Sequence, residues 1–240
     1  MKVVFAGPSI YGLDVAQYGV EVRPPAVQGD VARAVEDGAT IIGLIDGHFE
    51  QVASVWHKEI LHALSEGVTV LGAASMGALR AAECAAFGML PIGVIAHRYL
   101  SGELDDDAAV ALVNGPAELG YLPLSEAMVD AEATVHNMLA LQLISADEAT
   151  ALLSSARRLF FKQRTAQTIV TNGKLCGRDR EREVLDHYRH YRISLKAGDA
   201  AALLVAMQAL PPARRAERPS WVFGSSPFWR QQLEKTRAAP

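Results

Sequence analysis

Residues 68–87, VTVLGAASMGALRAAECAAF, decide the class of fold. Their first part, Val68–Ala73, is short, mostly apolar and rich in β-branched side chains, as buried strands of parallel sheets are. From Met76 to Phe87 the apolar residues recur at helical spacing, and Gly88 stands where a helix is expected to end. The stretch therefore predicts a strand, a tight turn at Ser75 and a helix.

The same alternation of strands and helices extends toward the N-terminus. Two more apolar runs, Val3–Ala6 and Thr40–Ile45, are typical of buried strands, and each is followed by Gly or Asp. Apolar residues at helical spacing predict helices over Asp30–Glu36 and Val52–Ser65. Two further segments are expected to supply strands, Val20–Ala26 and Ile92–Ala96. Strands that alternate with helices in this way indicate an α/β fold.

Helices replace this alternation after about Asp105. Ser145, with Glu148 three residues later, forms a capping box, which predicts the start of a helix. Other helices are expected over Met128–Leu143, Arg182–Arg192 and Asp199–Ala209. The last stretch of the chain is rich in Arg, Ser and Pro, and it carries four aromatic residues for docking, Trp221, Phe223, Phe228 and Trp229.

We therefore predict the α/β class, with a mostly parallel sheet and flanking helices in the N-terminal half and a helical C-terminal half. We expect a family-specific fold rather than a common superfold. The expected parts are an α/β core over residues 1–135, a helical region over residues 136–210 packed on the core, and an Arg- and Pro-rich tail or docking arm over residues 211–240. A length of 240 residues suits one large domain with an appendage.

Composition excludes several classes of function. The net charge of −4 gives no general reason to expect nucleic-acid binding, and the arginines between Arg178 and Arg192 alternate with acidic residues, as on a solvated helix face. Cys84 and Cys176 have neither zinc nor disulfide spacing, which indicates a reducing compartment. We find no signal-peptide segment and no apolar stretch long enough to span a bilayer, so we expect a cytoplasmic protein without membrane contact.

Ligands of open parallel sheets usually bind at the carboxyl ends of the strands. Three segments rich in small and polar residues follow predicted strands here, namely residues 7–9 (Gly-Pro-Ser), 46–48 (Asp-Gly-His) and 73–77 (Ala-Ala-Ser-Met-Gly). In a parallel sheet all three face one crevice, which is the predicted site. The first segment is too short for a phosphate-binding loop and lacks its Gly-Lys-Ser/Thr ending, so nucleotide binding is not expected.

The turn at Ser75 is the most informative of these segments. Ala73-x-Ser75-x-Gly77 differs in one residue type from the nucleophile elbow, a tight strand-to-helix turn that exposes a serine. The alanines of the following helix let it pack close to the sheet, and its first N–H groups suit an oxyanion. The alternative is that Ser75 only caps the helix, which is a frequent role of serine at this position.

A serine nucleophile needs a base, and Lys58 is the favoured candidate. It lies near the start of the helix that follows the strand at residues 40–45, where the first turns border the same crevice. Lys58 accepts a proton only when it is neutral, a state that desolvation or a neighbouring cation such as His62 promotes. Two alternatives stay open, since Lys58 also suits an exposed helix position paired with carboxylates and His57 is another base.

Metal binding is not predicted. His57 and His62 are five residues apart, whereas zinc-binding histidines on one helix face are four apart. The acidic run Asp105–Asp107 suits the positive end of the next helix better than Mg²⁺. Cys84 suits a packing position in a helix, and Cys176 in a polar loop is only a remote candidate for carrying sulfur.

These segments taken together resemble the TfuA-like family, whose members accompany YcaO enzymes in the thioamidation of peptide backbones. The resemblance covers roughly residues 1–135 and rests on the order of the motifs. The matching motifs are Gly7-Pro8-Ser9, Pro25-Ala26 with Gly29-Asp30, residues 42–47 (IGLIDG), residues 55–61 (VWHKEIL), residues 72–83 (GAASMGALRAAE), Phe87-Gly88-Met89, Tyr99, Gly102 and Asp105-Asp106-Asp107. Residues 128–132 (MVDAE) depart from the family pattern, which has Asn and Arg after Met-Val.

The resemblance implies a hydrolase-like protein with a Ser/Lys catalytic pair, which we carry over to Ser75 and Lys58. In this expectation Ser75 attacks the thiocarboxylate of a ThiS-like sulfur-carrier protein and releases sulfide for a YcaO enzyme, and the precursor peptide is a further partner. No metal and no organic cofactor are implied. The residues expected to bind the substrate are Ser9, Asp46, Gly47, His48, His57, Met76, Gly77 and Arg80.

Two other classes of function remain open. In the first, the chain is a non-catalytic adaptor that binds YcaO, the carrier or the precursor peptide, and Ser75 is a helix cap. In the second, a general serine esterase turns over small activated esters without a protein partner. Replacement of Ser75 separates the adaptor from both enzymes, because only the enzymes depend on its hydroxyl.

Overall fold

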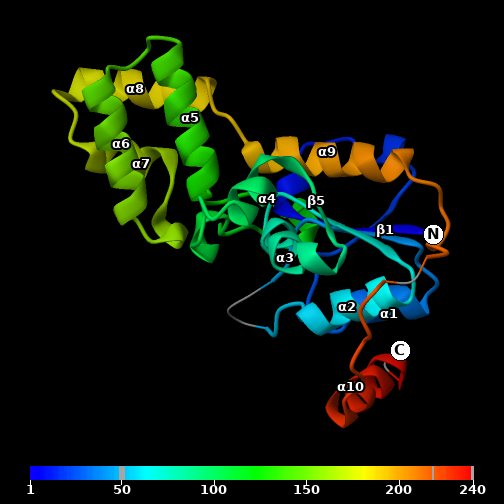
Figure 1. Ribbon diagram of the computed structural model, residues 1–240. Helices are drawn as coiled ribbons and strands as arrows, with labels where there is room; N and C mark the ends of the chain where they lie inside the picture. The colour runs from blue at the N-terminus through cyan, green and yellow to red at the C-terminus, as the bar shows by residue number, and fades with distance from the viewer. Residues whose placement is uncertain (49–51, 218, 239–240) are drawn as a thin grey trace. The chain divides into compact units, whose positions relative to one another are not determined.

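The computed structural model is coloured along the chain in Figure 1. It describes residues 1–48, 52–217 and 219–238. The chain forms two compact units, one made of Met1–Asp105 with Ala197–Pro240 and the other of Asp106–Lys196. The boundaries expected from the sequence, after residues 135 and 210, do not coincide with these units, because the chain returns to the sheet after residue 196.

Within the first unit, the described strands form a five-stranded sheet in the order β2-β1-β3-β4-β5. The strands are β1 Lys2–Phe5, β2 Glu21–Arg23, β3 Ile41–Leu44, β4 Thr69–Gly72 and β5 Leu90–Pro91. Every neighbouring pair is parallel, which confirms the predicted α/β class with a parallel sheet. This is also the strand order of flavodoxin-like doubly wound sheets, which bind ligands beyond the carboxyl ends of β1 and β3.

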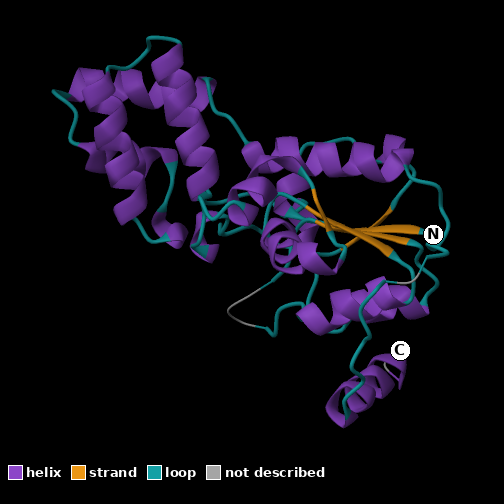
Figure 2. Ribbon diagram, viewed as in Figure 1, coloured by secondary structure: helices purple, strands orange, loops and turns teal. Residues whose placement is uncertain are grey.

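Helices cover both faces of this sheet (Figures 1 and 2). The helices of the first unit that pack on it are α1 Asp30–Glu36, α2 His57–Ser65, α3 Met76–Cys84 and α9 Leu195–Ala209. Successive side chains of a strand point to opposite faces, so Val3 joins the core under α1 and α2 while Val4 joins the core under α9. The strands are therefore buried from both sides, as their continuous apolar runs predict.

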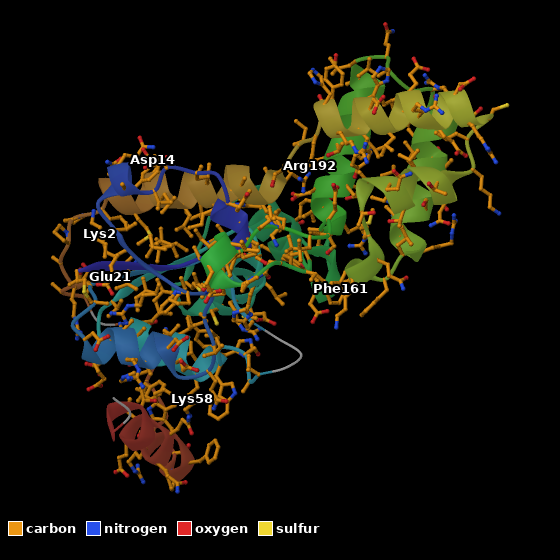
Figure 3. All side chains as sticks on the ribbon, turned by 180° about the vertical axis from the view of Figure 1, so that it is seen from behind. Lys2, Asp14, Glu21, Lys58, Phe161 and Arg192 are labelled. Carbon is orange, nitrogen blue, oxygen red and sulfur yellow. The ribbon has the colours of Figure 1, made fainter. Side chains whose placement is uncertain are left out.

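The position of α9 follows from the short connection between β1 and β2. Residues 6–20, all of them described, contain only 3-10 turns between these strands. Leu203 and other apolar residues of α9 cover the face that this connection leaves open. Lys2 fixes the end of α9, because its Nζ donates to the carbonyl oxygens of Met207 and Gln208 at 2.8 and 3.0 Å (Figure 3).

One strand prediction is wrong. Ile92–Ala96 does not form a strand, since α4 (Gly93–Leu100) begins there and the strand β5 ends at Pro91. The reason is a contact distant in sequence. Asp199 of α9 accepts hydrogen bonds from the N–H groups of Val94 and Ile95 at 2.9 and 2.8 Å, so its carboxylate caps the first turn of α4.

No strand is assigned within the second unit, all of whose residues are described, and its main elements are α-helices. These are α5 Met128–Ala140, α6 Ala146–Arg158, α7 Ala166–Gly173 and α8 Arg178–His190, joined by short turns. The capping box at the start of α6 is confirmed, because the Glu148 N–H donates to Ser145 Oγ and the Ser145 N–H donates to Glu148 Oε2. The helical C-terminal half is therefore also confirmed, with α7 as a helix that the sequence pattern did not reveal.

Buried polar groups form hydrogen bonds between distant segments of this second unit. Asp130 of α5 accepts hydrogen bonds from the Lys196 N–H at 3.1 Å and from Ser194 Oγ at 3.0 Å. Tyr188 donates its hydroxyl to Glu126 at 2.8 Å. Burial raises the pKa of both the Asp130 and the Glu126 carboxyl groups. Residues 128–132, where the chain departs from the family pattern, thus supply a structural carboxylate.

The segment expected to be a tail or docking arm contains α10 (Pro227–Ala238). We call residues 219–238 the C-terminal arm. Its Phe223 and Trp229 contact the ring of His62 on α2, with ring centroids 5.6 and 5.3 Å apart. Trp221 donates its indole N–H to the carbonyl of Phe87 at 3.1 Å. None of the helices in the described ranges has the length and apolar composition that crossing a bilayer requires.

Candidate active site

The predicted strand-turn-helix is present, with Ser75 at the N-cap of α3. Ala74 just before it has a positive φ of 65°, a backbone conformation that L side chains seldom adopt. The Ser75 N–H closes the turn by donating to the Ala73 carbonyl at 2.7 Å. The serine is thus held on a tight, strained turn beyond the carboxyl end of β4, as in the predicted elbow.

Two glycines allow α3 to start this close to the sheet. A Cβ on Gly77 would overlap the carbonyl oxygen of Leu44 in β3, and a Cβ on Gly72 would overlap the carbonyl oxygen of Gly77. The Gly77 N–H also donates to the carbonyl of Ile45 at 3.1 Å. The start of α3 is therefore locked against the backbone of the middle strand by contacts that only glycine permits.

The side chain of Ser75 is nearly buried and has no hydrogen-bond partner among the described residues. Its relative exposure is 8%. It makes no capping hydrogen bond to α3, and no other described residue hydrogen-bonds to its hydroxyl. A serine that served only as a helix cap would accept a hydrogen bond at this oxygen from an N–H of the first turn. The geometry therefore indicates that this hydroxyl is available to bind a ligand or to act as a nucleophile, and it argues against the capping role.

Ser9 and Asp46, two of the predicted substrate-binding residues, bind each other. Asp46 is 2% exposed, and it accepts hydrogen bonds from the Gly7 N–H at 2.8 Å, the Ser9 N–H at 3.0 Å and Ser9 Oγ at 2.7 Å. Backbone amides in such a turn often bind an external anion. Here the internal carboxylate takes that place, so the pair orders the loop after β1 at the switch point of the sheet.

Gly47 and His48 follow Asp46 and adjoin the Ser75 turn through Met76. A Cβ on Gly47 would overlap the sulfur of Met76, which shows how closely the loop after β3 packs on the start of α3. The His48 N–H donates to the carbonyl of Ala26 at 3.0 Å, while its side chain is exposed. The structure thus brings the predicted residues Gly47, His48, Met76 and Gly77 together beside Ser75.

His57 and Arg80 are joined by a carboxylate that sequence reasoning missed. Glu83 Oε2 lies 2.7 Å from His57 Nε2 and 2.6 Å from Arg80 Nη1. Arg80 also donates from Nε to the carbonyl of Val55 at 3.1 Å. These contacts tie the start of α2 to α3. The spacing of Arg80 and Glu83, three residues apart on one helix, was the available sequence signal for the pair.

Lys58 points to the C-terminal arm. Its Nζ lies 5.3 Å from the ring centroid of Phe223, and Figure 3 shows the side chain beside α10. On α2, Ile60 belongs to the core under the sheet, whereas His62, one turn from Lys58, contacts the arm. Within the described chain no hydrogen bond or ion pair joins Lys58 to Ser75. The structure therefore does not bring the two members of the expected catalytic pair together.

Other titratable groups near the site have structural roles. Glu59 is 1% exposed and accepts hydrogen bonds from the N–H groups of Gly29 and Trp56 at 2.8 and 3.2 Å, while burial raises the pKa of its carboxyl. Burial also raises the pKa of the Cys84 thiol to about 11, so little reactive thiolate forms at neutral pH. Among the described residues, no cluster of three or more His, Cys, Asp or Glu side chains is suited to hold a metal ion.

Comparison with known protein families places this site inside a matching region. The family described as "TfuA-like protein" matches residues 46–165, which include Asp46, Lys58 and Ser75 but neither Ser9 nor the C-terminal arm. The matched residues make up half of the chain. No curated protein matches the chain.

Proposed function

The chain belongs to the TfuA-like family, and we propose that this YcaO-associated accessory protein releases sulfide from a thiocarboxylated sulfur-carrier protein. The observation that carries the proposal is the hydroxyl of Ser75, which is nearly buried, has no partner among the described residues and stands at the N-terminus of α3. A hydroxyl in this position suits attack on an acyl carbon, because the helix end stabilises negative charge.

The proposed reaction has two steps. Ser75 Oγ attacks the thiocarboxylate carbon and its proton passes to the base. When the C–S bond breaks, the sulfur keeps the electron pair, takes that proton from the base and leaves as hydrosulfide. The acyl group is then an ester on Ser75. Water attacks the ester carbon, one of its protons passes through the base to Ser75 and the other is released to solvent, and the carrier leaves with an ordinary carboxylate. The sulfide is available to the YcaO enzyme, which thioamidates the precursor peptide.

Lys58 is the proposed base. In the described conformation its ammonium lies over Phe223, and a ring face attracts the charged ammonium rather than the neutral amine. A lysine accepts a proton only in its neutral form. Activity of the pair therefore requires Lys58 to leave Phe223 and to approach the Ser75 turn.

The remaining predicted residues are proposed to guide the tail of the carrier. Gly47 and His48 adjoin Met76 beside Ser75, and Arg80 lies on the same helix, where Glu83 and the carbonyl of Val55 hold its guanidinium. The two free cysteines suit a reducing compartment, and the cytoplasm is the proposed place of the reaction.

Two observations favour a second candidate function, a non-catalytic adaptor. Ser9 and Asp46 are occupied with each other, and Lys58 faces the C-terminal arm instead of Ser75. An adaptor needs a docking surface for YcaO, the carrier or the precursor peptide but no activated serine.

Release of sulfide by the purified wild-type protein distinguishes the two functions. The expected result is that a thiocarboxylated carrier loses sulfide and that mass spectrometry finds the carrier with a carboxylate, in an amount that exceeds the protein added. A blank without protein gives the background. Binding of the carrier or of YcaO without sulfide release by the folded protein would reject the enzyme and support the adaptor.

A further inference from the structure

The backbone amides at the start of α3 are nearly all hydrogen-bonded. The Ser75 N–H donates to Ala73, the Gly77 N–H to Ile45, and the N–H groups of the next two residues to the Ser75 carbonyl. Of residues 75–79, only Met76 has an N–H without a hydrogen-bond partner in the described part of the chain. This is the amide that directly follows the serine.

The loop after β3 shows the same pattern. The N–H groups of Ile45 and Asp46 donate to Phe5, and the His48 N–H donates to Ala26. Of residues 45–48, only Gly47 has an N–H without a hydrogen-bond partner among the described residues. A backbone amide that no protein group engages at this edge of the sheet is available as a donor to a ligand.

The two free amides belong to neighbouring turns. β3 and β4 are adjacent strands, and their last registered pair is Leu44 with Gly72. Gly47 packs on the Met76 side chain so closely that a Cβ would overlap its sulfur. The hydroxyl of Ser75, itself 8% exposed and without a partner among the described residues, lies at the same helix end. The two amides and the hydroxyl thus belong to adjoining turns beyond the carboxyl ends of β3 and β4.

We propose that the N–H groups of Met76 and Gly47 bind the carbonyl oxygen of the acyl group that Ser75 attacks. When Ser75 Oγ bonds to the thiocarboxylate carbon, the C=O π electrons move to that oxygen, and the two amides hold the negative charge. An amide from the residue after the nucleophile together with one from a neighbouring loop is the arrangement of nucleophile elbows. The inference rests on the proposed function and adds the donors for the acyl oxygen.

Replacement of one backbone amide by an ester tests the inference, because it removes the N–H and keeps the side chain. One variant carries glycolic acid in place of Gly47, and a second carries the α-hydroxy acid of methionine in place of Met76. Each is expected to lower the single-turnover rate of sulfide release by about 10²–10³-fold, the usual effect of one oxyanion donor, with little change in the Kd for the carrier.

A third variant, with glycolic acid in place of Gly38, is the matched control. The Gly38 N–H donates to Val35 at 3.1 Å, far from the site in the fold, so this ester should leave the release rate unchanged. Each ester variant is checked for folding by circular dichroism. If the variants at Gly47 and at Met76 both release sulfide at the wild-type rate, the inference about the two amides is overturned while the proposed function stands. Absence of release from the wild type would overturn the proposed function and this inference with it. Should one ester variant fail to fold, the other decides.

Discussion

Gly77→Ala is expected to lower the free energy of unfolding by about 3 kcal/mol or more. The added Cβ would overlap the carbonyl oxygen of Leu44, and backbone of a central strand cannot move aside as a side chain can. In most helix positions the same change stabilises, because alanine exceeds glycine in helix propensity by about 1 kcal/mol. The sign of the effect therefore reports the close contact between α3 and β3.

Gly198→Ala provides the matched control for this prediction. Gly198 lies in α9, and a Cβ there would meet no atom within 4 Å. The free energy of unfolding of this variant should be higher than that of the wild type by about 0.5–1 kcal/mol. Urea unfolding followed by tryptophan fluorescence measures both, because Trp56, Trp221 and Trp229 all belong to the first unit. A Gly77→Ala protein as stable as the wild type would show that the turn is looser than described.

Lys58→Ala and Lys58→Arg are expected to lower the rate of sulfide release by about 10²–10⁴-fold each, the usual contribution of a general base. An arginine keeps the charge and the contact with the Phe223 ring, but its guanidinium does not deprotonate in proteins. The arginine variant therefore separates the two roles of this position, since it preserves docking of the C-terminal arm and removes the base.

The release rates of both variants, together with tryptophan fluorescence of the arm, decide between these roles. If Lys58 is the base, both variants lose activity and the arginine variant keeps the wild-type fluorescence of Trp229. If release stays at the wild-type rate in both while Lys58→Ala changes the fluorescence, Lys58 is an anchor of the arm and the Ser/Lys pair is rejected. Circular dichroism confirms that each variant is folded.

Much of the sheet could be predicted because its signals are local. The strand, turn and helix around Ser75 follow from a short β-branched run, small residues and alanines at helical spacing, and all lie within twenty consecutive residues. Gly88 ends the helical segment with a positive φ of 102°, although α3 itself stops at Cys84 and Ala85–Phe87 form a 3-10 turn. The capping box at Ser145 is equally local, and it too is where the sequence predicts it.

The features that sequence reasoning missed depend on partners distant in the chain. Ile92–Ala96 has the composition of a strand, but Asp199, more than 100 residues away, caps α4 there. The direction of Lys58 is likewise set by Phe223 in the C-terminal arm. No local periodicity encodes such contacts, because they arise only when the elements pack.

The candidate site could be predicted in part from the topology of a parallel sheet. Carboxyl ends of parallel strands meet at one edge, so the gathering of Gly47, Met76 and Gly77 beside Ser75 could be expected from strand order alone. The pairing of Ser9 with Asp46 could not, because either side chain also suits a ligand. Only the packed structure shows that they satisfy each other.

The central claim is that the hydroxyl of Ser75 is the nucleophile that releases sulfide. The most direct test compares single-turnover sulfide release from a thiocarboxylated carrier by the wild-type protein and by Ser75→Ala at equal concentration. We expect release by the wild type and a rate at least about 10³-fold lower for the variant, with the fold and carrier binding preserved. Equal rates for the two proteins would contradict it.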